Sequence, residues 1–345
     1  GNRIYGRGSS DDKGEMITRI KAVESFLKET GDVPCNVKFV IEGEEETGSA
    51  HIEQYLKKYK KKFSCDGIIW EFGHVDNKDR PIIDLGMKGL LYVELSLRES
   101  NMDSHSSLAV LIENPAWRLI DALKTLRDPS GKILIKNWYN EVKPLSNEDI
   151  KILKSFPFNE VEFKKEFGIK QFLGNKKGLM IKKSLAAEPT CNIAGIVSGY
   201  HAEGAKTVIP AEGRVKIDFR LVPNMDPKKQ EIRLRKHLKS NGFGDIKIKV
   251  YHGEAAARTD SKHPFVSHVT SAASKSFGKY ILSVSSAGTG PMHSFTKILN
   301  APAIAIGSTH VFSRIHSPNE YTRIDLLKKA TKCMCIILEN FSKST

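Results

Sequence analysis

Residues 37–46 read Val-Lys-Phe-Val-Ile-Glu-Gly-Glu-Glu-Glu, a short apolar run that ends in a cluster of acids. The apolar part is rich in β-branched side chains and predicts a buried strand over Val37–Ile41. A second predicted strand, residues 67–70, also ends in an acid, Glu71. Because ligands bind at the carboxyl ends of the strands in open α/β sheets, both acidic positions are candidates for a functional site.

Helical patterns lie on either side of these strands. Apolar residues recur at helical spacing over residues 16–27, and another helical stretch follows at 52–59. The same texture returns near Pro264, with a helix to Phe277, a strand over Ala301–Ile306 and a helix over Ile324–Phe341. Strands that alternate with helices favour an α/β domain, with a mostly parallel sheet and helices on both of its faces.

The pattern changes in the middle of the chain. Residues 90–97 and 213–221 alternate between apolar and polar, the period of a half-exposed antiparallel strand. Helices are predicted to begin at Asn114-Pro115 and Asp226-Pro227, where a capping residue precedes proline. These elements predict an α+β sandwich that interrupts the α/β domain. We therefore predict residues 1–88 and 254–345 as the two parts of the α/β domain and 89–253 as the sandwich, with a polar insertion of unassigned role at 128–188.

Composition narrows the class of protein. The 345 residues carry 54 Lys and Arg against 40 Asp and Glu, a net charge of +14. The basic residues are spread along the chain and no zinc-finger, basic-zipper or RNA-recognition signature is present, so we expect no nucleic-acid partner. No run reaches the ~18 apolar residues of a membrane span, so we expect no membrane association. Five cysteines, an odd number, favour a reduced, cytoplasmic protein. The chain opens at Gly1 without Met, which we interpret as the start of a fragment.

A set of acids and one histidine could carry chemistry. Asp11 precedes a predicted helix, three adjacent glutamates stand at 44–46, Glu71 ends a strand, and His316 lies in a turn-rich loop. Taken singly, Asp11 is explained as a helix cap, Glu71 as a surface acid and His316 as a loop histidine. The three adjacent glutamates repel one another unless they are solvated or share a cation. Together they form the oxygen and imidazole set that a zinc or manganese site requires, and one additional glutamate could serve as a base for a metal-bound water.

Seven motifs follow one another along nearly the whole chain: Gly6-Arg7-Gly8-Ser9-Ser10-Asp11-Asp12-Lys13-Gly14, Glu42-Gly43-Glu44-Glu45-Glu46-Thr47-Gly48-Ser49, Asp103-Ser104-His105-Ser106, Lys206-Thr207-Val208-Ile209-Pro210, Arg220-Leu221-Val222-Pro223, Gly288-Thr289-Gly290-Pro291 and His316-Ser317-Pro318-Asn319-Glu320. With these motifs in this order, the sequence resembles the dinuclear zinc exopeptidase family of carnosinases, aminoacylases, glutamate carboxypeptidase G2, and acetylornithine and succinyl-diaminopimelate deacylases. The resemblance implies that 1–88 and 254–345 form the catalytic domain and that 89–253 is a lid/dimerisation domain.

The resemblance also implies a metal centre. Two divalent metal ions per subunit are expected, zinc first, with manganese or cobalt as alternatives. Asp11 would bridge the two ions, Glu46 and His316 would bind one of them, and Glu71 the other. Glu45 would be the general base on the water between them. The family's remaining metal histidine belongs to a His-x-Asp motif, and that position lies before Gly1.

Further roles are implied for residues outside the metal centre. His105 resembles the histidine that reaches across a dimer to stabilise the oxyanion. Arg220 resembles the arginine that binds the terminal carboxylate of the substrate, and Thr207 and Thr289 match positions near that substrate. A homodimer that acts on a small peptide or an N-acyl amino acid is therefore expected.

We predict a metal-dependent exopeptidase, either a carboxypeptidase or a dipeptidase, that hydrolyses the amide bond of dipeptides or short peptides with a free carboxylate. Two alternatives stay open at this point. The same metal centre could deacylate N-acyl amino acids, or the chain could be catalytically incomplete and act as a dimerisation or binding module.

Overall fold

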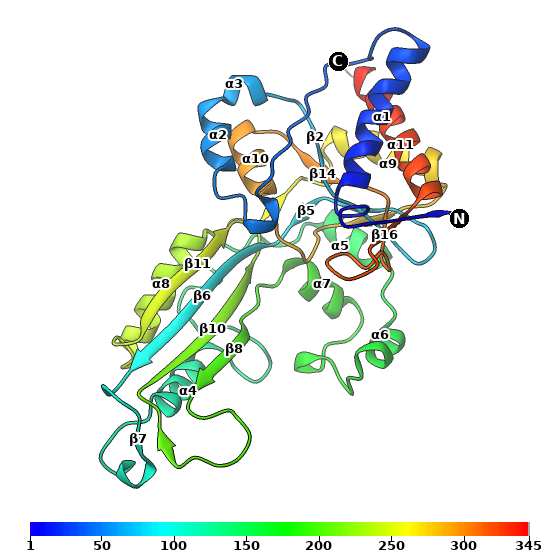
Figure 1. Cartoon of the computed structure of the whole chain (residues 1–345). Helices are drawn as coiled ribbons and strands as arrows, with labels where there is room; N and C mark the ends of the chain where they lie inside the picture. Colours follow the sequence, from blue (N-terminus) through cyan, green and yellow to red (C-terminus); the bar gives the residue numbers. More distant parts are fainter. Residues whose placement is uncertain (344–345) are drawn as a thin grey trace. The chain divides into compact units, whose positions relative to one another are not determined.

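The helices and strands of the chain fall into two units in the computed structural model, which describes residues 1–343 (Figure 1). Unit 1 consists of residues 1–87, 145–158 and the described chain from 257 onward. Unit 2 consists of residues 88–144 and 159–256. The segment 145–158, which lies within the sequence-predicted insertion, thus groups with unit 1.

The central sheet of unit 1 has four short strands in the order β13–β4–β14–β2. β13 (Ile281–Ser283) runs parallel to β4 (Ile82–Asp84), and β14 (Ala303–Ala305) runs parallel to β2 (Ile68–Trp70). β4 and β14 meet in the antiparallel sense, so the sheet is mixed. All three residues of β14 are buried, as expected of a strand that has partners on both sides. The predicted α/β class is confirmed.

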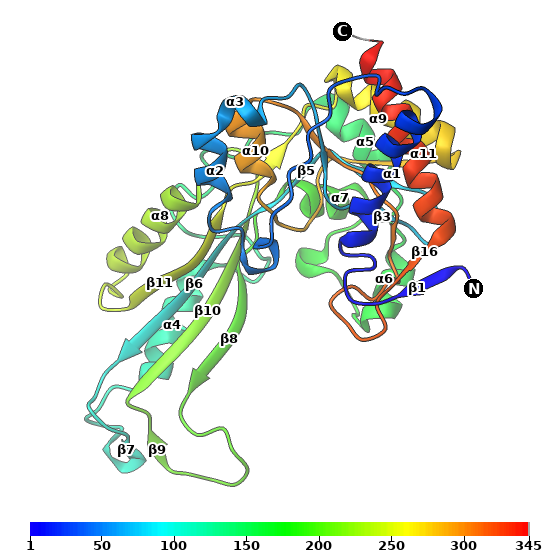
Figure 2. The ribbon, with the colours of Figure 1, turned by 45° about the horizontal axis from the view of Figure 1, so that its top comes forward.

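Helices pack around this sheet in two groups. α1 (Lys13–Glu29), α9 (Pro264–Phe277) and α11 (Ile324–Ser342) lie side by side, with α11 in contact with both of the others (Figures 1 and 2). α2 (Ile52–Lys58) packs against α10 (Met292–Leu299). The unit also contains α3 (Lys60–Phe63), α5 (Asn147–Ser155), the 3₁₀ turn η1 (Glu45–Thr47) and three two-stranded pairs, β1–β16 (Arg3–Tyr5, Tyr321–Arg323), β15–β3 (Thr309–His310, His74–Val75) and β12–β5 (Ala257–Arg258, Gly86–Met87).

One predicted strand is absent. The predicted buried strand over Val37–Ile41 is wrong for this structure, because the segment is irregular and its Phe39 and Ile41 side chains are exposed. A strand satisfies its backbone N–H and C=O groups through a neighbouring strand, and no strand within residues 1–343 pairs with this segment. The acids that follow it are nevertheless ordered by the turn η1.

Unit 2 is built on a four-stranded antiparallel sheet in the order β11–β6–β10–β8 (Figure 2). Its strands are β6 (Gly89–Arg98), β8 (Asn192–Ser198), β10 (Glu212–Leu221) and β11 (Lys247–Glu254). Every second side chain of β6 and β10 is buried, which confirms the alternation in the sequence. The buried faces of both strands join one core with helices α4 (Pro115–Leu126) and α8 (Pro227–Ser240).

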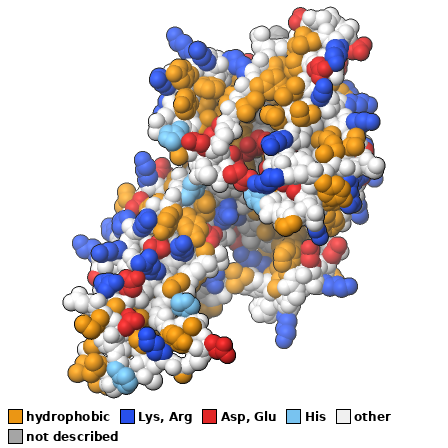
Figure 3. All heavy atoms as spheres, viewed as in Figure 1, with side chains coloured by type: hydrophobic (Ala, Val, Ile, Leu, Met, Phe, Trp, Pro, Cys, Tyr) orange, Lys and Arg blue, Asp and Glu red, His pale blue; other side chains and the backbone are white. Residues whose placement is uncertain are grey.

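The rest of unit 2 is irregular or in short elements. Its remaining helices and strands are β7 (Ser104–His105), η2 (Ser106–Leu108), α6 (Glu160–Phe167), η3 (Leu173–Asn175), α7 (Leu179–Ala187) and β9 (Val208–Ile209). Across residues 1–343, no helix has both the length and the apolar character needed to cross a bilayer. Lysine and arginine side chains are scattered over the face shown in Figure 3 rather than gathered in one patch.

A buried ion pair anchors α5 within unit 1. Asp149 accepts a hydrogen bond of 2.9 Å from the Arg258 guanidinium, and both side chains are less than a tenth exposed. Removing one partner leaves the other charge buried without compensation, so Asp149→Ala is expected to lower the free energy of unfolding by about 3–5 kcal/mol. Asp121→Ala removes an exposed pair with Lys124 and is expected to change it by less than about 1 kcal/mol. Urea unfolding of both variants measures the difference, and equal losses would contradict the prediction.

Candidate metal centre

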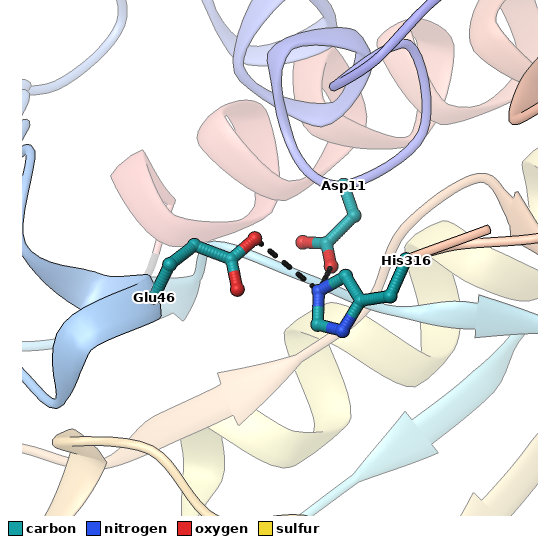
Figure 4. A group of neighbouring side chains, drawn as sticks. All are labelled: Asp11, Glu46 and His316. Carbon is teal, nitrogen blue, oxygen red and sulfur yellow. Dashed lines mark ion pairs between the residues drawn. The ribbon is translucent and has the colours of Figure 1, made fainter. Parts of the chain in front are cut away.

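Three loops of unit 1 bring a histidine and two carboxylates together. Asp11 lies between β1 and the start of α1, Glu46 lies in η1, and His316 lies in the loop between β15 and β16. Each side chain offers one potential ligand atom, and these three atoms lie within 4.8 Å of one another. Figure 4 shows the three side chains pointing toward one another. Residues more than 260 positions apart in the chain therefore meet at one point.

The imidazole is the centre of this group. His316 Nε2 lies 3.0 Å from Asp11 Oδ2 and 3.2 Å from Glu46 Oε1. The Glu46 and His316 side chains are more than half exposed, whereas Asp11 is largely buried. One imidazole nitrogen and two carboxylates form a donor set that suits zinc or manganese, and the open side leaves room for further ligands. The residues present therefore fit a divalent cation.

More acids surround this group. Burial, Glu46 and other nearby carboxylates raise the pKa of Glu45, and burial together with Glu46 raises the pKa of Asp11. Glu71 shows the largest shift: burial, followed by Glu45, Asp12 and Asp11, raises its pKa to about 8. Burial and neighbouring carboxylates thus both disfavour the charged forms of these acids, and a bound cation would offset that cost.

A buried ion pair fixes the strand end that carries Glu71. Arg19 of α1 pairs with Glu15, and its guanidinium donates hydrogen bonds to the carbonyl oxygens of Trp70 (3.1 Å) and Ile306 (3.0 Å). Trp70 immediately precedes Glu71, and Ile306 lies just beyond β14. Arg19 thus ties the ends of two strands to the first turns of α1. Neither Glu15 nor Arg19 was singled out from the sequence, because an i, i+4 pair reads as ordinary helix stabilisation.

Glu320 and Arg7 were also missed as functional residues. Both stand within the quoted motifs, but the sequence offers no sign of which backbone groups they meet. Glu320 is buried and accepts hydrogen bonds from backbone N–H groups of the loop that carries Asp11. Arg7 bonds to both Glu320 and Glu46.

The other predicted site residues belong to other elements of the chain. Thr289 of unit 1 lies in the loop between β13 and α10, outside the three-residue group. In unit 2, His105 and Thr207 come together where β7 pairs with β9, with 3.3 Å between His105 Nε2 and the Thr207 hydroxyl. Arg220 lies on β10, where its backbone N–H donates to the Thr190 hydroxyl.

The chain is similar to known proteins over nearly its whole length. The model of peptidase family M20/M25/M40 matches residues 1–340. The structure of the M20 family metallo-carboxypeptidase Sso-CP2 from Sulfolobus solfataricus is 38% identical with a TM-score of 0.94, over 99% of this chain and 78% of that one. The dipeptidase Dug1p from Saccharomyces cerevisiae is 25% identical with a TM-score of 0.82, over 99% of this chain and 73% of that one.

Among curated sequences, human Beta-Ala-His dipeptidase is 33% identical over 239 residues, which are 68% of this chain and 47% of the human protein. The rat and mouse Beta-Ala-His dipeptidases match over 52% of their own lengths. The chain thus spans about half the length of these curated relatives.

The raised pKa of Glu71 has a consequence for stability in the metal-free protein. Between the ordinary glutamate pKa near 4.5 and about 8, the folded chain holds a proton on Glu71 that the unfolded chain has released. The folded state binds more protons, so its stability is expected to fall as the pH rises from about 5 to 8. Asp84, whose pKa burial raises to about 7, adds to the same slope.

Thermal unfolding in the presence of a chelator measures this slope. Glu71→Gln is expected to flatten it, while Glu29→Gln, which removes an exposed acid at the end of α1, leaves it unchanged. An equally steep slope in Glu71→Gln would contradict the assignment.

Proposed function

Because the chain belongs to peptidase family M20/M25/M40, we propose that it acts as a metal-dependent exopeptidase, a carboxypeptidase or dipeptidase that hydrolyses dipeptides or short peptides with a free carboxylate. Family membership confirms the resemblance carried by the seven motifs. The observation that carries the proposal is the convergence of Asp11, Glu46 and His316 from three separate loops. Relatives named as Beta-Ala-His dipeptidase, Cys-Gly metallodipeptidase and metallo-carboxypeptidase support this substrate class.

We propose two divalent ions per subunit, zinc first, with manganese or cobalt as alternatives. Asp11, Glu46 and His316 would hold one ion, and Asp11 would share the second with Glu71. When bound, such ions polarise the scissile carbonyl and lower the pKa of water. Among the described residues, Asp11, Glu46 and His316 lie together as three potential ligands of the first ion, whereas the second ion has two proposed ligands. The first ion is therefore expected to bind more tightly than the second.

Glu45 is the proposed general base. It precedes Glu46 on η1, and burial and its carboxylate neighbours raise its pKa, the direction that suits a general base. Its carboxylate oxygen would accept a proton from the attacking water and then deliver it to the nitrogen of the leaving amine. Glu45 would thus serve in both proton transfers.

Residues outside the metal centre would orient the substrate. Arg220 would bind the terminal carboxylate, because its planar guanidinium can make two parallel hydrogen bonds to the two carboxylate oxygens. Thr289 and Thr207 are proposed substrate contacts, and His105 is the proposed oxyanion donor. The contact between His105 and the Thr207 hydroxyl supports a joint role for these two residues.

Unit 2 is the proposed lid/dimerisation domain, and β8 is its proposed contact with a second copy of the chain. β8 is an end strand: it pairs with β10, and no strand among residues 1–343 pairs with its other edge. Ile196 and Val197 on this strand are 54% and 62% exposed. An unpaired apolar edge is normally protected, and two identical edges can pair in the antiparallel sense about a twofold axis.

The catalytic proposal is tested with a substrate panel. The purified chain, supplied with zinc or manganese, is incubated with Beta-Ala-His, Cys-Gly and N-acetylated amino acids. Hydrolysis of the dipeptides is expected, is lost with a chelator, and falls by about 10²–10⁴-fold in kcat in Glu45→Gln because the base is removed. Glu44→Gln changes an acid of the same run that bonds to His51 instead, and is expected to retain activity.

The other outcomes separate the alternatives. Turnover of the N-acetylated amino acids alone would favour the deacylase. A chain with neither metal-dependent turnover nor metal binding would be the catalytically incomplete module, and unchanged kcat in Glu45→Gln would contradict the role of that residue.

Sedimentation tests the proposed dimer. The chain is expected to sediment at twice its own mass, and Ile196→Glu is expected to give single chains because it places a charge on the paired edge. Ile232→Glu is the control, since Ile232 is also an exposed isoleucine of unit 2 but lies on α8. A wild-type monomer, or an Ile196→Glu dimer, would contradict the assignment of β8.

A further inference from the structure

Glu320 is a buried carboxylate that faces the backbone of the Asp11 loop. Its side chain is almost fully buried, and it lies four residues after His316. One carboxylate oxygen accepts the N–H groups of Ser10 (2.9 Å) and Asp11 (3.0 Å). The other accepts the N–H of Gly8 at 3.0 Å. Three backbone donors of one loop therefore converge on a single side chain.

The local chain conformation makes this convergence possible. Gly8 has a φ of +80°, which glycine adopts readily because it lacks a Cβ. The turn aims its N–H groups inward and forms a concave site for an anion, which the Glu320 carboxylate fills. Burial alone would raise the pKa of Glu320, but the hydrogen bonds from Asp11, Ser10 and Gly8 outweigh it and lower that pKa. Three N–H donors favour the ionised form of the side chain that accepts them, and hydrogen bonds to a charged acceptor are the stronger kind.

The same carboxylate is linked to the other two members of the three-residue group. Arg7 donates to Glu320 at 3.3 Å and to Glu46 at 2.6 Å. The link to His316 is covalent, through the short stretch 316–320, in which His316 itself has a left-handed φ of +57°. The Arg7–Glu46 pair is more than half exposed, so it contributes little by itself. The buried bonds to the Asp11 loop are the main connection.

We propose that Glu320 is a positioning residue: it holds the Asp11 loop beside His316 and Glu46, so that the metal-binding atoms of the chain are placed before an ion arrives. This inference rests on the proposed function, because it assigns Glu320 a role in the same metal centre. Outer groups that orient metal ligands typically change metal affinity by about 10–100-fold when they are altered. A carboxylate with a purely structural role would affect stability alone.

Glu320→Gln and Asp149→Asn form a matched pair of variants. Both replace a buried acid of unit 1 that accepts a backbone N–H and pairs with an arginine, but Asp149 bonds to Ser146, the residue before α5, and to Arg258 on β12. An amide at position 320 keeps the size of the side chain and can accept at only one of its two ends, so some of the three N–H groups lose their acceptor. Glu320→Asp keeps the charge with a shorter reach and serves as the conservative variant.

Three measurements separate positioning from support of the fold: the zinc Kd by competition with a chelating dye, hydrogen exchange of the backbone amides of residues 8–11 without metal, and the Tm. Glu320→Gln is expected to weaken zinc binding by about 10–100-fold and to speed exchange at residues 8–11. Glu320→Asp is expected to recover part of both losses. Asp149→Asn is expected to lower the Tm with no change in zinc Kd or in that exchange.

Each outcome decides the inference. If Glu320→Gln lowers the Tm but leaves the zinc Kd and the exchange of residues 8–11 unchanged, Glu320 is structural and the proposal is overturned. If the wild-type chain binds no zinc, the proposed function fails, and the exchange of residues 8–11 still shows whether Glu320 holds the loop. If Glu320→Gln does not fold, unchanged zinc Kd and exchange in Glu320→Asp would overturn the proposal.

Discussion

Mutual repulsion of carboxylates is the constraint on which unit 1 depends. Burial raises the pKa values of Asp11, Glu45 and Glu71, and neighbouring carboxylates raise them further: Asp11 acts on Glu45 and Glu71, and Glu45 acts on Glu71. Placing like charges together in a partly buried site costs free energy, and the rest of the fold has to offset that cost. A divalent cation is the ligand that relieves such repulsion most directly. This is why the cluster is better explained by binding than by stability.

The segments that carry these acids are held in place by hydrogen bonds between their backbone groups and buried side chains. Glu320 accepts three N–H groups of the Asp11 loop, and Arg19 donates to the carbonyl oxygen before Glu71. The two devices are complementary: a carboxylate binds backbone donors and a guanidinium binds backbone acceptors. Both are largely buried, so water competes little with these bonds. Backbone restraint leaves the acidic side chains themselves available to a ligand.

Unit 2 follows a different physical principle. Its sheet and two helices share one apolar core that includes Trp138 and Phe219. The β6 side chains that point away from this core are partly or fully exposed, and β8, at the edge of the sheet, exposes apolar side chains. Unit 1 carries the acidic group, whereas unit 2 is built around an apolar core.

Local pattern determined most of the elements from the sequence alone. The alternation of β6 and β10, the cap-plus-proline starts of α4 and α8, and the span of α11 depend on neighbours within a few residues, and the structure matches them. Motif order also indicated that Asp11, Glu46 and His316 belong to one site. The strand expected at Val37–Ile41 failed because a strand depends on a partner that may lie anywhere in the chain.

Only the tertiary structure decided which groups hold that site in place. Asp11 and His316 are 305 positions apart, and Glu320 acts on backbone N–H groups more than 300 residues away. Backbone groups are identical in every residue except proline, so no sequence pattern reveals which of them will meet a side chain. Side-chain identity determined the chemistry that this chain can carry. The long-range packing of loops decided where that chemistry is assembled.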